Sequence, residues 1–227
     1  MSAPHSATLT AAAQDCLKAV WSTREWTDEP VTISLLAGRL TLSASTVSES
    51  VKKLTAEGLL AHEPYGAIEL TVPGRQVALA MVRRHRLLET FLVEYLGYTW
   101  DEVHDDAEVL EHAVSDRFVS RLARRLGEPE RDPHGDPIPR EDGTLPELPA
   151  VRLDQVRSGR PVTVVRVSDR SPEVLRYVAQ QGILLGRVLT VLDRQDAAGT
   201  LTVRIGARDE RLGVPAAQAV FVLPTDS

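Results

Sequence analysis

The stretch "ISLLAGRLTLSASTVSESVKKLTAEG", residues 33–58, decides how the first part of the chain folds. Its letters predict a short helix, a turn at "TLS", and a second helix that ends at Gly58, because glycine is frequent just after a helix. In the second helix Val47, Val51 and Leu54 recur at i, i+4 and i+7, which predicts one buried stripe. The stretch is therefore typical of a helix-turn-helix whose second helix has one apolar face and one polar face.

The segments on either side extend this motif to a winged helix-turn-helix. Residues 9–26 have a helix-forming composition, with apolar residues at helical spacing. Residues 59–74 predict two short strands joined around Tyr65-Gly66, which would form the wing. The second helix of such a unit enters the major groove of DNA. Its outer face offers hydroxyl, carboxylate and ammonium groups to bases or phosphates: Ser43, Ser45, Thr46, Ser48, Glu49, Lys52 and Lys53.

Two other interpretations of this motif stay open. The two helices can pack together for structural reasons alone, or the winged helix can bind a protein rather than DNA. The segment is not strongly basic, whereas phosphate contacts normally supply much of the affinity for DNA. Dimerisation would double the set of contacts, so we expect the DNA-binding form to be a dimer.

The remaining sequence predicts a helical region followed by a small β-barrel. Residues 75–97 predict one long helix. Thr99 and Glu102 have the spacing of a capping box, which predicts a second helix that starts there and runs to about Leu126. Residues 128–149 contain too much proline for a helix or a central strand, so we expect a loop or linker there. Beyond them, β-branched runs separated by turns suggest a barrel with one helical insertion. We therefore expect a mainly α fold with β structure, in three domains: 1–73, 74–149 and 150–227.

The composition is that of an ordinary soluble globular protein. Of the 227 residues, 43% are hydrophobic and 26% are charged, and no apolar run approaches the ~20 residues of a membrane span. The N-terminus lacks the basic and apolar parts of a secretory signal, and the single cysteine, Cys16, excludes an intrachain disulfide framework. We therefore expect a cytoplasmic protein. The net charge of −6 argues against indiscriminate binding to nucleic acid.

A second pattern, "VHDDAEVLEHAVSD" at residues 103–116, predicts a metal site. On a helix, one face would carry imidazole and carboxylate groups at i, i+4, i+7 and i+8: His104, Glu108, Glu111 and His112. The preceding helix carries His85 and Glu89 at i and i+4, so antiparallel packing can bring the two faces together. Imidazole and carboxylate groups are ligands of divalent cations. The alternative is a solvated acidic face that binds nothing.

These motifs together resemble the diphtheria toxin repressor family of metal-dependent transcriptional repressors. The resemblance is carried by "MVRRHRLLE" (81–89), "VHDDAEVLEHAVSD" (103–116) and "HGDPIP" (134–139), between a winged helix and a barrel-like tail. It implies an N-terminal DNA-binding domain, a helical domain that dimerises and binds metal, and a C-terminal SH3-like domain. It also implies a homodimer that binds double-stranded operator DNA.

The resemblance further implies two metal sites. The primary site, which activates the protein, would be formed by Asp15, Glu108, Glu111 and His112. The ancillary site would be formed by His85, Glu89 and His104, joined from the third domain by Glu173. Lys18 stands where shorter manganese regulators carry a second acid, so their closely coupled pair of metals is not expected here. Asp132 and Asp136 disfavour the anion that family members hold beside the residue matching Arg86.

Two positions indicate the metal. The iron-responsive branch of the family has methionine where this chain has Asp15, and cysteine where it has Glu108. Carboxylate oxygens suit hard ions such as Mn²⁺, whereas thiolate and thioether groups favour softer ions. The resemblance is therefore closest to the manganese transport regulators and implies a manganese-responsive repressor of manganese uptake genes. Fe²⁺ is the alternative, and Co²⁺ or Zn²⁺ can bind in vitro.

Two other classes of function compete with a repressor. A di-iron or di-manganese carboxylate enzyme needs a Glu-x-x-His motif on each of two helices, whereas the spacings here are Glu108-x-x-x-His112 and His85-x-x-x-Glu89. The sequence also lacks a zinc-protease HExxH motif, so we expect no enzymatic activity. The other class is a regulator of the same shape that senses a small molecule and leaves the polar helix face solvated.

Overall fold

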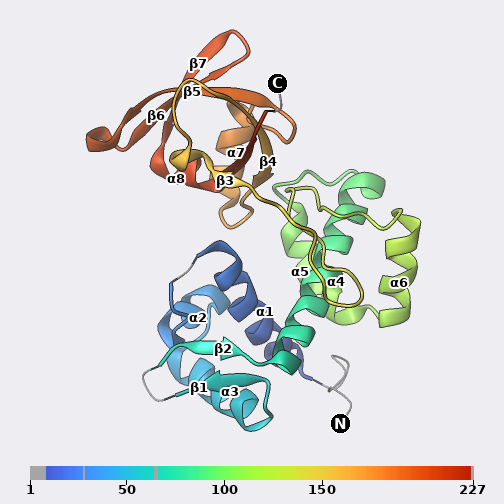
Figure 1. Ribbon diagram of the computed structural model, residues 1–227. Coiled ribbons are helices and arrows are strands. Elements are labelled where there is room, and N and C mark those ends of the chain that lie inside the picture. Colours follow the sequence, from blue (N-terminus) through green and yellow to red (C-terminus); the bar gives the residue numbers. More distant parts are fainter. Residues whose placement is uncertain (1–8, 28, 64–65, 226–227) are drawn as a thin grey trace. The chain divides into compact units, whose positions relative to one another are not determined.

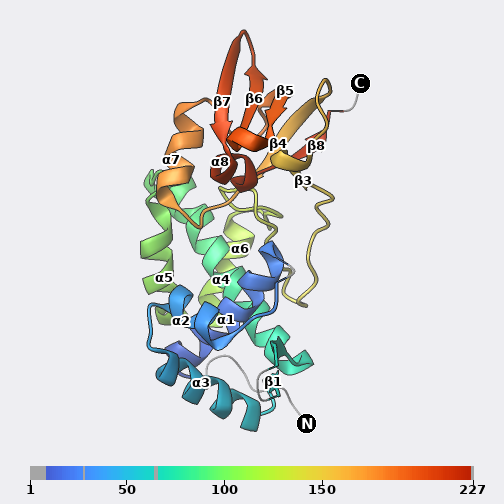
Figure 2. The same cartoon turned by 90° about the vertical axis from the view of Figure 1, so that its left-hand side faces the viewer.

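The computed structural model describes residues 9–27, 29–63 and 66–225. The chain divides into two compact units, and Figures 1 and 2 show the elements of each. The first unit comprises Met1–His85, Glu111–Val114 and Pro139–Leu145, and the second comprises Arg86–Leu110, Ser115–Ile138 and Pro146–Ser227. None of the helices in the described part of the chain is long and apolar enough to cross a membrane.

The first unit contains the winged helix-turn-helix that the sequence predicts (Figure 1). Its elements are the helices α1 (Ala11–Trp26), α2 (Ile33–Leu40) and α3 (Ala44–Ala56), and the strands β1 (Leu60–His62) and β2 (Ile68–Leu70). The two strands pair antiparallel and form the wing. Below α3, Val47, Val51 and Leu54 are buried in one core with Leu17 of α1 and Leu36 of α2. The apolar stripe of α3 is therefore confirmed.

Local hydrogen bonds fix the turn between α2 and α3. Thr41 ends α2 in the left-handed conformation, with φ of 54°, and the Leu42 N–H donates to the Ala37 carbonyl. Ser43 is the N-cap of α3, and its hydroxyl accepts a hydrogen bond from the Thr46 N–H. The turn thus satisfies backbone groups at the end of one helix and at the start of the next.

The helical region contains α4 (Val72–Leu96), α5 (Val103–Ala113) and α6 (Asp116–Arg125) (Figure 2). The prediction of one helix from about Thr99 to Leu126 is wrong, because the chain breaks between α5 and α6. Ser115 has extended backbone there, and its hydroxyl accepts a hydrogen bond from the Phe118 N–H, which starts α6. The Glu102 carboxylate accepts the Thr99 N–H at 3.0 Å, as in a capping box, but α5 begins only at Val103, so this contact lies before the helix and does not open it.

The proline-rich stretch after α6 has neither a helix nor a strand, as predicted, but it is not a solvated linker. It contains one isolated bridge, between Arg131 and Pro137. Asp132, His134 and Asp136 are nevertheless buried. Polar groups that are buried in an irregular segment require partners, and the segment is therefore packed into the protein interior.

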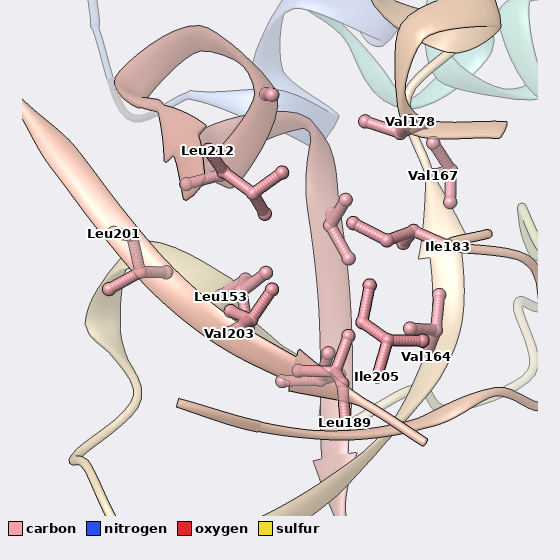
Figure 3. Close-up of a cluster of buried hydrophobic side chains, with 14 of the residues drawn as sticks. Leu153, Val164, Val167, Val178, Ile183, Leu189, Leu201, Val203, Ile205 and Leu212 are labelled. Carbon is pink, nitrogen blue, oxygen red and sulfur yellow. The ribbon is translucent and has the colours of Figure 1, made fainter. Parts of the chain in front are cut away.

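The C-terminal region is a six-stranded antiparallel sheet with short helices. Its strands are β3 (Val151–Arg152), β4 (Pro161–Val167), β5 (Val188–Gln195), β6 (Thr200–Ile205), β7 (Arg208–Gly213) and β8 (Val220–Pro224), in the order β3-β8-β4-β5-β6-β7. Helix α7 (Pro172–Gln180) is the predicted insertion, and α8 (Val214–Ala219) precedes β8. Bulges at Val164/Arg166 and Val191/Asp193 bend the strands around a common apolar core (Figure 3). The expected fold class, mainly helical with a small C-terminal β domain, is confirmed.

Candidate metal centre

One cluster of potential ligands, the first cluster, lies in the first unit and consists of Asp15, Glu111 and His112. Asp15 lies on α1 of the winged helix, and the other two lie in the last turn of α5. His112 Nε2 is 2.8 Å from Asp15 Oδ1 and 3.6 Å from Glu111 Oε1. One oxygen or nitrogen from each residue lies within 4.8 Å of the others, so a single cation can reach all three.

A neighbouring amide fixes the orientation of the His112 ring. Its Nδ1 lies 2.9 Å from Gln14 Oε1, and because an amide oxygen only accepts, Nδ1 carries the proton. In the neutral ring the lone pair then lies on Nε2, which faces Asp15 and Glu111. A hydrogen bond of this kind to the non-ligating nitrogen is what holds metal-binding histidines in place.

Glu111 is fully buried, and both of its carboxylate oxygens have partners. Lys18 Nζ lies 2.6 Å from Oε1, and His85 Nδ1 lies 2.6 Å from Oε2. Burial alone would raise the pKa of Glu111, but the hydrogen bond and charge of His85, together with the Lys18 ammonium, lower that pKa below its ordinary value. Glu111 is therefore an ionised carboxylate in the interior.

Glu108 and His85 were also expected to bind metal, Glu108 in the primary site and His85 in the ancillary site. Glu108 is half-buried on α5, one helical turn before His112. His85, expected beside Glu89 and His104, has its Nδ1 against Glu111 of the first cluster. Residues at i and i+4 of a helix share a face, but their side chains can still turn to different neighbours.

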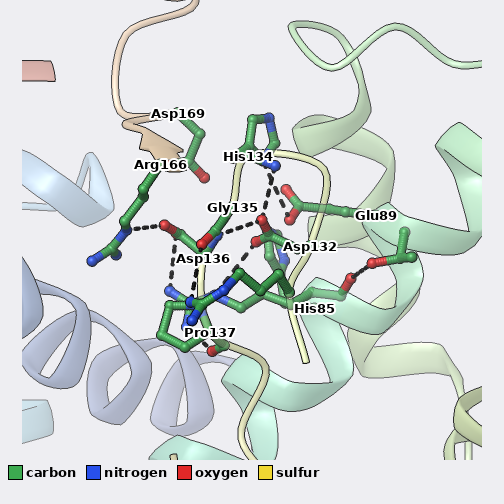
Figure 4. Close-up of polar contacts among 12 residues, drawn as sticks. His85, Glu89, Asp132, His134, Gly135, Asp136, Pro137, Arg166 and Asp169 are labelled. Atoms are coloured by element: carbon green, nitrogen blue, oxygen red, sulfur yellow. Dashed lines mark hydrogen bonds and ion pairs between the residues drawn. The ribbon is translucent and has the colours of Figure 1, made fainter. Parts of the chain in front are cut away.

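A second cluster of potential ligands lies in the second unit and consists of Glu89, His134 and Asp169 (Figure 4). Glu89 lies on α4, His134 in the proline-rich stretch, and Asp169 between β4 and α7. His134 Nδ1 is 3.9 Å from Glu89 Oε2. His104 adds an exposed imidazole to this cluster, because its Nδ1 lies 3.5 Å from Glu89 Oε1 and 3.8 Å from Asp169 Oδ2.

His134 has the donor pattern of a metal ligand. Its Nε2 donates to the Trp100 carbonyl at 2.6 Å, so the lone pair of the neutral ring lies on Nδ1. Nδ1 is buried and has no hydrogen-bond partner among the residues that the structure describes. Burial opposes a charge on the ring, yet the carboxylates of Glu89, Asp132 and Asp169 raise the pKa of His134 to about 9. The cluster therefore favours a positive charge at Nδ1, which a cation can supply as well as a proton.

The loop around His134 is shaped by its own side chains. Asp132 Oδ1 accepts the backbone N–H groups of His134 and Asp136, at 2.8 and 2.9 Å. The His134 carbonyl accepts the Val167 N–H of β4 at 2.9 Å. Gly135 has φ of +85°, and a Cβ there would lie 2.1 Å from the Val165 carbonyl oxygen. The loop is thus pressed against β4 in a way that only glycine permits.

Beside the second cluster, two buried arginines share a carboxylate. Arg86 Nη2 lies 3.1 Å from Asp136 Oδ2, and Arg166 Nε is bonded to Asp136 Oδ1 (Figure 4). Arg86 also donates to the Pro137 carbonyl at 2.7 Å. Asp136 was expected to disfavour an anion beside Arg86. Its carboxylate is itself paired with the Arg86 guanidinium, in the place where such an anion would bind. Burial and the neighbouring carboxylates Asp136 and Glu89 raise the pKa of Asp132 well above its ordinary value.

The sequence reasoning missed His134 and Asp169. His134 belongs to the motif HGDPIP, but its place among prolines favours a linker rather than a buried potential ligand. Asp169 directly precedes the turn into α7, whereas Glu173, the predicted third-domain ligand, is exposed in the first turn of α7. The only available signal was an isolated histidine or aspartate in a loop, which is common in any protein.

The candidate DNA-contacting residues all lie on α3 or at its N-cap. The side chains on its outer face are exposed: Ser43, Ser45, Thr46, Ser48, Glu49, Lys52 and Lys53. Ser43 Oγ lies 2.8 Å from both Ser45 Oγ and Thr46 Oγ1, which gathers three hydroxyls at the start of the helix. This face has the hydrogen-bonding groups that base edges and phosphates require.

Three segments of the chain match known families. Residues 8–68 match "Iron dependent repressor, N-terminal DNA binding domain", residues 71–140 match "Iron dependent repressor, metal binding and dimerisation domain", and residues 151–224 match the FeoA domain. The chain is 39% identical over 137 residues to the iron-dependent repressor IdeR of Mycobacterium leprae. That match covers 57% of this chain and 60% of the relative's length.

Solved structures give longer matches. A manganese-dependent transcriptional repressor in complex with manganese is 54% identical, with a TM-score of 0.90, and the match covers 93% of this chain and 99% of that one. The manganese regulator SloR is 33% identical with a TM-score of 0.82, over 96% of this chain and 100% of that chain. The relatives therefore include proteins named for iron and proteins named for manganese.

Proposed function

Because the chain belongs to the diphtheria toxin repressor family of metal-dependent DNA-binding transcriptional repressors, we propose that it is a manganese-responsive repressor of manganese uptake genes. It would act in the cytoplasm as a homodimer on operator DNA. The family consists of regulators rather than enzymes. The observation that carries the proposal is the first cluster, because it joins α1 of the winged helix to the end of α5.

The first cluster would hold the activating ion through Asp15, Glu111 and His112, with Glu108 as a further ligand from the preceding turn of α5. The ion would supply positive charge between the carboxylates of Asp15, Glu108 and Glu111. Asp15 would then be drawn towards the end of α5, and the position of α1 would become fixed. Because α1 packs against α2 and α3 in one core, fixing α1 also orders the helix that reads DNA.

The donor set favours manganese. Asp15, Glu108 and Glu111 offer oxygen and His112 offers nitrogen, which suits hard divalent ions. The single cysteine is not a competing ligand, because burial, together with the charge of Asp15, raises the pKa of Cys16 to about 11. The 54% identity to a repressor named for manganese supports this choice. The identity to IdeR keeps an iron-responsive repressor as the second candidate.

We further propose that the second cluster is the ancillary metal site. Its ligands would be Glu89, His134 and Asp169, with His104 completing the set from α5. The support is the buried Nδ1 of His134, which faces carboxylates and has its other nitrogen fixed by the Trp100 carbonyl. Such an ion would connect α4 with the loop that follows β4, and would stabilise that part of the second unit.

DNA binding across a metal series tests the function. Metal-free protein would be titrated onto one duplex, selected for binding, at buffered free Mn²⁺, Fe²⁺, Co²⁺ or Zn²⁺. We expect Mn²⁺ to tighten DNA binding by about tenfold or more over chelator-treated protein, since allosteric coupling typically amounts to 1–3 kcal/mol. Equal DNA binding with chelator and with Mn²⁺ would refute the switch. Full activation by Fe²⁺ with only partial activation by Mn²⁺ would favour the iron-responsive alternative.

A substitution tests the choice of metal separately. Glu108→Cys replaces an oxygen donor by a thiolate, so the response should shift from Mn²⁺ towards Fe²⁺ and other softer ions. Glu108→Gln removes the charge without adding sulfur and is the matched control. An unchanged ranking of metals in Glu108→Cys, with the control weakened, would show that the oxygen donors do not set the preference.

A further inference from the structure

Lys18 places an ammonium group directly on a ligand of the first cluster. It lies one turn after Asp15 on α1, so the two side chains share a face of that helix. Its Nζ is 2.6 Å from Glu111 Oε1, and its side chain is only 13% exposed. The same oxygen lies 3.6 Å from His112 Nε2. The ammonium therefore contacts the oxygen through which Glu111 would face a cation bound between Asp15 and His112.

The other oxygen of Glu111 does not offer an alternative. His85 Nδ1 lies 2.6 Å from Oε2, on the opposite side of the carboxylate. The Glu111 carbonyl, in addition, accepts a hydrogen bond from Arg84 Nη1 at 3.1 Å, which holds the backbone in place. A metal ion at Oε1 thus meets Lys18, and two cations repel each other strongly in a buried site.

We propose that Lys18 is a tethered cation that competes with the activating metal for Glu111. This inference rests on the proposed function of the first cluster as a metal site. In the metal-free protein the ammonium neutralises the buried carboxylate and keeps the cluster folded. When metal binds, Lys18 leaves Oε1 and its flexible side chain reaches solvent at the partly exposed edge of the cluster. The residue therefore lowers the metal affinity and sets the concentration at which the protein responds.

This role differs from that of an ordinary structural ion pair. A structural pair would be kept in both states, and removing the lysine would weaken the metal site by loosening Glu111. A competing cation is lost on metal binding, so removing it makes the metal-free state less stable and the metal complex relatively more favourable. The two roles predict opposite changes in metal affinity.

The test measures Mn²⁺ binding to the full chain by calorimetry and follows thermal unfolding with and without Mn²⁺. Lys18→Met removes the charge while keeping the length of the side chain. We expect Lys18→Met to bind Mn²⁺ about tenfold more tightly, to unfold at a lower temperature without metal, and to gain more from Mn²⁺ than the wild type. Lys18→Arg keeps a cation at the site and should stay close to the wild type.

Two further variants keep the result interpretable. Arg24→Met removes an exposed positive charge from the same helix and should leave Mn²⁺ affinity unchanged. Lys18→Gln offers Glu111 a neutral hydrogen-bond donor and serves if Lys18→Met does not fold. Equal or weaker Mn²⁺ binding by a folded Lys18→Met or Lys18→Gln would overturn the proposal. Absence of Mn²⁺ binding at this centre in the wild type would instead refute the proposed function.

Discussion

At the scale of single residues, Glu111 combines complete burial with a charge. Replacing it by glutamine leaves the Lys18 ammonium and the His85 ring against a neutral amide. Removing one partner of a buried ion pair typically costs about 3–5 kcal/mol, so Glu111→Gln should lower the free energy of unfolding by that order in urea titrations. It should also abolish Mn²⁺ binding to the first cluster. Glu108→Gln, at a half-buried position, should change the free energy of unfolding by less than about 1 kcal/mol.

His134 gives a second residue-scale prediction. His134→Ala removes the buried Nδ1 that faces Glu89 but leaves the first cluster intact. The number of Mn²⁺ ions bound per chain, measured by mass spectrometry of the intact protein, should therefore fall by one. DNA binding should remain dependent on Mn²⁺, because the first cluster is the proposed switch. An unchanged Mn²⁺ stoichiometry in His134→Ala would contradict the ancillary site.

At the scale of elements, the loop at Gly135 depends on close contact with β4. Gly135→Ala would place a methyl group against the Val165 carbonyl in a left-handed backbone conformation. We expect a loss of about 2 kcal/mol or more, with weaker retention of metal by the second cluster, in thermal unfolding followed with and without Mn²⁺. Gly159→Ala is the matched control, because its φ of +89° is similar but nothing lies within 4 Å of the added Cβ. It should cost only about 1 kcal/mol.

The elements also show what the sequence allows one to predict. The buried stripe of α3 could be predicted because Val47, Val51 and Leu54 repeat with the helical period. The β-branched runs after residue 160 likewise predicted the strands of the sheet. The break at Ser115 was missed because the residues on both sides favour helix. The start of α6 is set by one capping hydroxyl, that of Ser115. His134 and Asp169 were missed for another reason. Their meeting with Glu89 depends on how separate loops pack, and no local pattern encodes that.

At the scale of the whole molecule, the proposed dimer needs apolar side chains to bury, and α4 to α6 expose several of them. Large apolar side chains are exposed on these helices: Tyr95, Leu96, Val109 and Phe118. Val109→Glu should therefore raise the dimer dissociation constant by about tenfold or more in analytical ultracentrifugation, and weaken DNA binding in parallel. Val188→Glu, at an exposed position on β5, is the control and should leave the dimer intact. A dimer unaffected by Val109→Glu would mean that another surface associates.

The Asp136 carboxylate, which Arg86 and Arg166 share, affects how the protein responds to inorganic anions. Two buried guanidinium groups would otherwise attract whatever inorganic anion is abundant, and the protein's behaviour would then vary with phosphate or sulfate supply. Asp136 supplies a carboxylate to both groups as part of the polypeptide, and Asp132 Oδ2 also lies 3.6 Å from Arg86 Nε. Thermal stability and Mn²⁺ affinity should accordingly be the same in phosphate and in chloride of equal ionic strength. The proposed response to Mn²⁺ should therefore not depend on which inorganic anion is present.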